Sequence, residues 1–163
     1  MDFSTYTNSL STLTTAQVQA LTRTDLASLT VAQATAVDAA FIGALLPSQI
    51  PGFATDDLVL LTTAAIAALT QDQVTGLNVT QMVVLTSTQL GALTNTAIAA
   101  LSNRQVAALT TDQVNTLSTA TLNALTSTQI TYLELVDIAA LNSESIAALT
   151  NANLQALTLK QVG

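Results

Sequence analysis

The chain has 163 residues, of which half are apolar and 8% are charged, and its formal net charge is −7. This length and apolar content suffice for one folded domain with a core and argue against intrinsic disorder. The three basic residues, Arg23, Arg104 and Lys160, are scattered, so the chain lacks the basic surface that nucleic-acid binding needs. Cysteine and histidine are absent, which excludes disulfides, Cys/His metal sites and the usual proton shuttle near neutral pH.

No segment of the chain has the pattern of a membrane span or of a secretory signal. The longest run without a strongly polar side chain covers residues 39–46, far short of the roughly 20 residues that a spanning helix needs. The first residues contain no basic region followed by an apolar stretch. We therefore expect no membrane span and no N-terminal secretory signal.

A tandem repeat of eight residues runs from Leu13 to Gly163, and we expect residues 1–12 to form an N-terminal cap segment before it. The nineteen blocks contain no insertion or deletion, although the last is one residue short. Numbered within a block, position one is apolar in all nineteen, position six is Val, Ile, Leu or Met in eighteen, and position five is Gln in ten. The consensus is Leu-Thr-x-x-Gln-Ile/Val-x-Ala, and such a fixed period is typical of solenoids.

An eight-residue period is incompatible with one long helix. A continuous helix would rotate each block by about 80° relative to the last, so the chain must break once per block. Thr or Ser at position two followed by Gln at position five is the capping-box pattern, which marks a helix start. We therefore predict a short helix over positions three to eight, with its N-cap at position two and its core residues at positions one and six. The pattern occurs at Thr14/Gln17, Thr30/Gln33, Thr70/Gln73, Thr86/Gln89, Ser102/Gln105, Thr110/Gln113, Thr126/Gln129 and Thr158/Gln161.

The acidic and small residues indicate the same phase. All nine acids within the array lie at positions two, four or five, which are the cap and first turn of the predicted helix, where the helix dipole favours negative charge. Position eight is Ala, Gly or Ser in fourteen of eighteen blocks. We expect neighbouring backbones to approach closely at that position.

These patterns predict an all-α fold, a solenoid of very short capped helices with one helix per eight-residue repeat. A β-solenoid is the alternative, because Thr and Val favour strands. In a strand, however, positions one and six would point to opposite faces, and five glycines are few for a tight turn in every block. The simplest superhelix has two helices per coil, which at a helix spacing of about 8–10 Å gives a rod on the order of 80–90 Å long.

Two places depart from the regular pattern. Residues 37–60 keep the apolar period but lose the polar cap at Leu46 and Ala54, and they contain both prolines. We favour a degenerate repeat there; a bend, a longer helix over 38–46 and a boundary between two arrays are alternatives. The array stops at Gly163 inside a block, so we expect either a piece of a longer chain or end-to-end assembly.

Residues 108–114, Ala-Leu-Thr-Thr-Asp-Gln-Val, show the consensus clearly. Over residues 13–162 the tandem octads resemble arrays in large bacterial repeat proteins that are described as secreted, surface or calcium-binding. The resemblance implies the repeat architecture and an extracellular or cell-surface setting in a bacterium, with a cytoplasmic location left open. It implies no activity, and the Gly- and Asp-rich nonapeptides that bind calcium in such proteins are missing here.

We assign no catalytic, cofactor-binding or metal residue. The adjacent pair Asp56 and Asp57 could be a metal or acid/base site, but positions four and five favour two helix-start residues. Glu134, Asp137 and Glu144 could line one edge and make a weak calcium contact, yet no Asp-x-Asp-x-Asp-Gly loop is present. Serine and threonine have no histidine base that would make them nucleophiles.

The predicted function is a non-catalytic structural module, acting as a spacer, scaffold or self-assembling segment of a bacterial protein. No cofactor is expected, and the expected partner is a second copy of the chain, end to end or lateral, or another protein. An alternative is a protein-binding solenoid that presents one face. A further alternative is ice or crystal-surface binding through the rows of Thr, although we expect the hydroxyls at position two to be used as N-caps.

Overall fold

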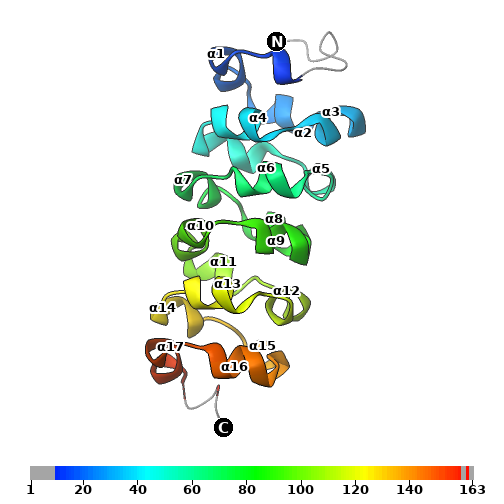
Figure 1. The fold of residues 1–163 in the computed structure, drawn as a ribbon. Coiled ribbons are helices and arrows are strands. Elements are labelled where there is room, and N and C mark those ends of the chain that lie inside the picture. Colours follow the sequence, from blue (N-terminus) through cyan, green and yellow to red (C-terminus); the bar gives the residue numbers. More distant parts are fainter. Residues whose placement is uncertain (1–9, 159–160, 162–163) are drawn as a thin grey trace.

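The computed structural model describes residues 10–158 and 161, which form a continuous stack of short helices (Figure 1). Helix α1 lies at one end of the stack and α17 at the other. The part described contains no strand, and each helix from α1 to α17 begins at position three of its block. The all-α solenoid prediction is confirmed, and the β-solenoid alternative is wrong.

The helical elements in chain order are η2 (Leu10–Thr12), α1 (Thr15–Gln19), α2 (Arg23–Ala27), α3 (Val31–Ala36), α4 (Ala39–Ala44), η3 (Pro47–Gly52), α5 (Thr55–Leu58), α6 (Thr63–Ala67), α7 (Gln71–Val74), α8 (Val79–Val84), α9 (Ser87–Ala92), α10 (Asn95–Ala100), α11 (Asn103–Val106), α12 (Thr111–Asn115), α13 (Thr119–Ala124), α14 (Ser127–Ile130), α15 (Leu135–Ala140), α16 (Ser143–Ala148) and α17 (Asn151–Ala156). The expected N-terminal cap segment, residues 1–12, lies outside the described residues except for η2.

Each helix inside the stack packs against the helices three blocks before and three blocks after it, and the helices at the ends pack on one side. Helix α9 contacts α6 and α12, and α10 contacts α7 and α13. One coil therefore contains three blocks, or 24 residues, and the prediction of two helices per coil was wrong. The eighteen blocks over residues 13–156, all within the described part, make six coils, so a helix spacing of about 8–10 Å gives a stack roughly 50–60 Å long.

The corners between helices are made by extended residues at positions one and two. Leu45, for example, has φ −68° and ψ 144°, and Thr62 has φ −67° and ψ 156°. No residue in the described part has a positive φ. An extended pair thus turns the chain at each corner without glycine, which explains how the array closes its coils with so few glycines.

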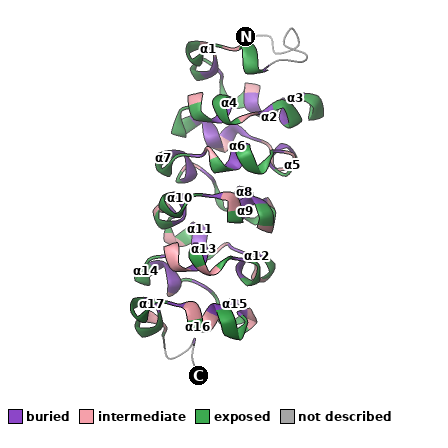
Figure 2. Ribbon diagram, in the orientation of Figure 1, coloured by how far each residue is buried: buried purple, intermediate pink, exposed green. Residues whose placement is uncertain are grey.

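The core is a single column of apolar side chains along the inside of the stack. The residues at positions one and six, such as Leu90 and Leu93, are buried in almost every block and form one continuous cluster. In Figure 2 the exposed residues lie on the outer sides of the helices. An isolated helix of this length is unstable in water, so each helix is stabilised by the burial of its apolar face against the coils before and after it.

The irregular stretch, residues 37–60, keeps its place in the stack. Helix α4 ends at Ala44, so no longer helix covers 38–46. The block with both prolines forms the 3₁₀ helix η3, which packs against α2 and α7 as a regular block would. Helix α5 starts after Ala54 without a side-chain cap. The stretch is therefore a degenerate part of the same repeat.

Helices that lie three blocks apart stack in a row, which we call a column. The close approach expected at position eight occurs at two glycines of one column. A Cβ on Gly52 would lie 2.8 Å from Arg23 Cα, and a Cβ on Gly76 would lie 2.6 Å from the Pro47 carbonyl oxygen. Both distances are too short for a side chain. Along the described part, no helix is long and apolar enough to cross a membrane.

Candidate functional site

Each α-helix with Gln at position five starts with a reciprocal pair of hydrogen bonds between positions two and five. In α9 the Gln89 N–H donates to Thr86 Oγ1 (3.1 Å), and the Thr86 N–H donates to Gln89 Oε1 (2.9 Å). The capping-box prediction is confirmed for α1, α3, α7, α9, α11, α12 and α14. The hydroxyls at position two are thus committed to the start of their own helix.

The same glutamines also bind the preceding coil. Gln89 is only 3% exposed, and its Nε2 donates to the carbonyls of Leu58 and Leu61, each at 2.8 Å. We call this pair of bonds the inter-coil glutamine clamp. The acceptors lie 31 and 28 residues earlier, at positions six and one. The clamp is also made by Gln49, Gln73, Gln81, Gln105, Gln113, Gln129 and Gln161.

Glutamine suits this position because its amide offers one acceptor and two donors. The oxygen satisfies an N–H at the helix start. One N–H group satisfies the position-one carbonyl, for which no backbone donor is found in the described residues. The other adds a second hydrogen bond to the position-six carbonyl; that of Leu58, for example, already accepts the Leu61 N–H at 3.2 Å. Outside the helices, every backbone–backbone hydrogen bond found in the described residues is local in sequence. The polar link between coils is therefore carried by side chains.

The sequence pattern predicted only the capping half of this role. A capping box accepts Glu as well as Gln at its last position, yet no block has Glu at position five. A carboxylate could accept the N–H bond but could not donate to the two carbonyls. The preference for Gln, which occurs in ten blocks against Asp in three and Glu in none, was the available signal that this side chain also acts as a donor.

One block replaces the clamp with two asparagines. Asn153 Nδ2 donates to the Leu125 carbonyl (3.1 Å), which lies 28 residues earlier. The Thr150 N–H, which a glutamine would bind from position five, donates instead to Asn123 Oδ1 (3.0 Å). Asn123 Nδ2 donates to the Ala148 carbonyl. The side-chain amides of these two asparagines, which lie in neighbouring coils, thus make together the kinds of hydrogen bond that one glutamine makes elsewhere.

Asp137 also occupies position five, and its carboxylate, which has no proton to donate, accepts a hydrogen bond from a hydroxyl of the preceding coil. Its Oδ2 accepts the Glu134 N–H (2.9 Å), and its Oδ1 accepts the Thr111 hydroxyl proton (2.8 Å). Both oxygens of this buried carboxyl therefore have a donor.

Asp57, also at position five, accepts no such hydrogen bonds from the described residues. It is 6% exposed, and no residue in the described part forms a hydrogen bond with its carboxyl group. The residue that corresponds to Thr111, 26 positions earlier, is Val31. Burial, and then the neighbouring charge of Asp56, raise the pKa of Asp57 above its ordinary value of 3.8.

Asp25 shows the opposite behaviour at the same position of an outer block. The Thr22 hydroxyl donates to Asp25 Oδ2, as does the Thr22 N–H, both at 2.7 Å. These donors favour the charged form and lower the pKa of Asp25 below 3.8, although the residue is largely in contact with water.

The acids that the sequence singled out are helix-start residues. Asp56 and Asp57 lie in the first turn of α5 and Glu144 in the first turn of α16. Glu134 is the N-cap of α15, and Asp137 lies one turn further on. Within the described residues, no three acidic side chains gather where they could hold a metal ion.

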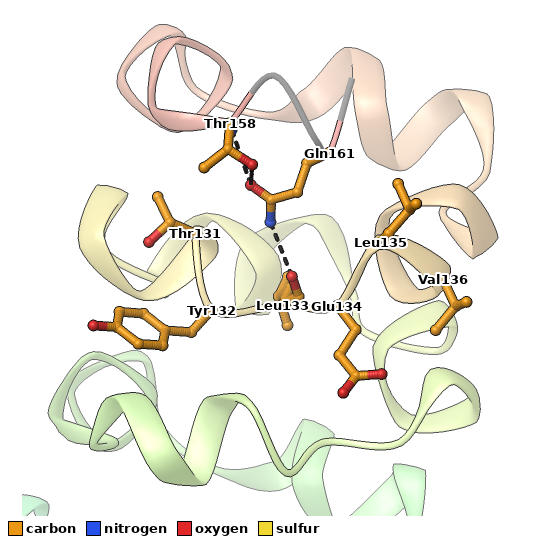
Figure 3. A pocket seen from close by; sticks show the side chains of 8 residues that line it. All are labelled: Thr131, Tyr132, Leu133, Glu134, Leu135, Val136, Thr158 and Gln161. Atoms are coloured by element: carbon orange, nitrogen blue, oxygen red, sulfur yellow. Dashed lines mark hydrogen bonds between the residues drawn. The ribbon is translucent and has the colours of Figure 1, made fainter. Parts of the chain in front are cut away.

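A pocket of about 510 Å³ lies near the last described coil (Figure 3). Its one charged side chain is Glu134, and Tyr132, Leu135 and Val136 give it exposed apolar edges. Gln161 crosses it and donates to the Leu133 carbonyl, so part of the lining is a glutamine clamp.

The comparisons with known proteins agree with this repeat. A family profile described as the ALTTAQ repeat matches residues 50–87 and 82–119. Its first letter corresponds to position eight of one block and the other five to positions one to five of the next, as in Ala-Leu-Thr-Thr-Asp-Gln at 108–113. No curated protein and no solved structure matches the chain. The chain is thus a tandem octapeptide array, a structural repeat module that is similar over residues 50–119 to the ALTTAQ repeat.

Proposed function

We propose that this module is a non-catalytic spacer or scaffold that holds whatever adjoins it at a set distance. The observation that carries the proposal is the inter-coil glutamine clamp, which recurs from Gln49 to Gln161 with the same two acceptor positions. Each coil is thereby placed on the one before by directional bonds as well as by apolar packing. A stack built in this way has a length that depends on the number of blocks.

The test is to lengthen the stack by one coil. Residues 85–108 are three complete blocks, and a second copy inserted after Ala108 leaves every later block on a sequence identical to its present neighbour. We expect small-angle X-ray scattering to show a maximum dimension longer by about 8–10 Å, and circular dichroism to show proportionally more helix.

The matched control inserts 24 residues of Gly and Ser at the same place, which cannot form a coil. We expect that variant to add no helical signal and no regular increment in length. A duplicated coil that also adds neither would refute the spacer proposal.

A second candidate, protein binding or lateral self-association, is favoured by one group of exposed side chains. Val31, Val59, Val79 and Val83 are 42–68% exposed. Val31 lies on α3, Val59 directly follows α5, and Val79 and Val83 lie on α8; these three helices pack on one another in one column. Light scattering over a range of concentrations tests this candidate. Concentration-dependent association that the double variant Val59→Thr, Val83→Thr abolishes would support it, and a monomer at all concentrations would exclude the lateral contact.

We also propose an extracellular or cell-surface location in a bacterium. The acidic, cysteine-free composition, with an isoelectric point near 4.1, and the resemblance of the octads to bacterial surface arrays support this proposal. Antibody labelling of intact cells tests it, and labelling that requires lysis would place the protein inside.

A further inference from the structure

Asp57 occupies the clamp position of α5, where this helix packs on α3 of the preceding coil. At this position a glutamine would donate to the carbonyls 31 and 28 residues earlier, which here are those of Leu26 and Leu29. An ionised carboxylate has no proton to donate. No side chain of the described part supplies the donor that Thr111 gives to Asp137.

A side chain of this length can reach one of the two carbonyls. Asn153 lies in the same column of the stack, has the same number of carbons as aspartate, and donates to the carbonyl 28 residues earlier at 3.1 Å. A protonated carboxyl has the shape of the asparagine amide and carries one O–H donor. Its acceptor at position 57 would be the Leu29 carbonyl.

We propose that Asp57 is a proton-operated latch between the first two coils, whose protonated carboxyl donates to the Leu29 carbonyl and whose ionised form leaves that bond unmade. The proton comes from solvent and returns to it, so no other reactant is required. Among the described residues, every fully buried polar side-chain atom has a partner. The unpartnered oxygens of Asp57 therefore keep contact with water, through which the proton can enter.

The charges around the latch favour the protonated form. Neither α3 nor α8, the two helices that pack against α5, carries a titratable side chain. On α5 itself the other ionisable group is Asp56, whose charge opposes ionisation of Asp57. Helix α2, which precedes α3 in the chain and packs against η3, carries Arg23 and Asp25. Arg23 Nε donates to the Ser48 carbonyl, and Asp25 accepts hydrogen bonds from Thr22.

The direction of the pH effect follows from proton linkage. Because folding raises the pKa of Asp57, the native chain binds more protons than the unfolded chain above pH 3.8. The contribution of the latch is complete below this value and is lost as the pH rises through the pKa of the folded state. The first coil should therefore be held more firmly in mild acid than at neutral pH.

Hydrogen exchange on the full chain tests the proposal. Protection factors, corrected for the intrinsic rate at each pH, are measured for the amides of α3 and α5, with α13 as the internal reference. Between pH 7 and pH 4.5 we expect protection in α3 and α5 to rise relative to α13, by no more than about tenfold per pH unit for one proton. Asp57→Asn carries its donor at every pH, so its relative protection should be high and independent of pH.

Two further variants make the result specific. Asp137→Asn should leave the response of α3 and α5 unchanged, because that carboxyl already has its donors. Asp56→Asn keeps the latch but removes the neighbouring charge, so the rise in protection should move to lower pH. A wild-type protein whose α3 and α5 do not respond to pH, or an equal response in Asp57→Asn, would overturn the latch. So would a transition that Asp56→Asn leaves at the same pH.

Discussion

Two successive interfaces of one column, α5 on α3 and α8 on α5, differ in the side chain at the clamp position. Gln81 joins α8 to the coil before it through the carbonyls of Ile50 and Phe53, at 3.3 and 2.8 Å. Asp57 makes no such bond, yet Leu58 on its helix is as completely buried as Met82 is on α8. Apolar packing alone is thus sufficient to stack one coil on the next. The clamp adds hydrogen bonds to backbone carbonyls at an interface that packing already forms.

The largest expected effect tests whether packing is equivalent where the clamp is present and where it is absent. Leu58→Ala and Leu90→Ala each remove a fully buried side chain at position six, one in the helix that carries Asp57 and one in a helix with a clamp. We expect each to lower the free energy of unfolding by about 2–5 kcal/mol, as measured by urea denaturation. A neutral Leu58→Ala would show that the α5 interface is not packed.

A smaller effect on the free energy of unfolding is expected when the glutamine of a clamp is replaced by glutamate, which cannot donate the two hydrogen bonds. Gln81→Glu can still accept the Asn78 N–H but loses both donors. The Phe53 carbonyl is left without a partner, whereas the Ile50 carbonyl keeps the Phe53 N–H. One unpaired buried polar group costs about 1–3 kcal/mol, so we expect a loss of about 1–3 kcal/mol at pH 7. The loss should shrink in acid, where the new carboxyl is protonated. Gln81→Glu with wild-type stability at pH 7 would contradict the clamp.

The reverse substitution installs a clamp where none exists. Asp57→Gln should supply donors to the Leu26 and Leu29 carbonyls and remove a buried charge, raising the free energy of unfolding by about 1–2 kcal/mol at pH 7. The matched control is Asp137→Gln, where the bonds from Thr111 and Glu134 are already present and the gain should be smaller. An equal increase in the free energy of unfolding at both sites would contradict the inference that the carboxyl of Asp57 is less well hydrogen-bonded than that of Asp137.

The smallest effect concerns Asp25, whose carboxyl has donors but little burial. Because the pKa of Asp25 is lowered by Thr22, its contribution to stability is present above pH 3.8 and is lost as the pH falls through the pKa of the folded state. NMR titration should place that pKa below 3.8, and Thr22→Val, which removes the hydroxyl donor, should move it upward. An unchanged titration in Thr22→Val would assign the shift to other groups.

These comparisons also separate what could be predicted from what could not. The helix boundaries were predictable because caps act within one block: Thr86 and Gln89 are three residues apart and meet in any short helix that starts there. The core positions followed from the same phase. The burial of Gln89 and its bonds to Leu58 and Leu61 were not predicted, because those partners lie 28 and 31 residues away.

By itself the sequence determined the repeat, the helical phase, the N-caps and the apolar face, since each depends on residues within eight positions of one another. Only the tertiary structure decided that three blocks make a coil, because near-identical blocks carry no mark of which neighbour they will contact. The same near-identity hid the difference between Asp57 and Asp137. Both are aspartates at position five, and one is satisfied because the coil before it presents Thr111, while the other meets Val31.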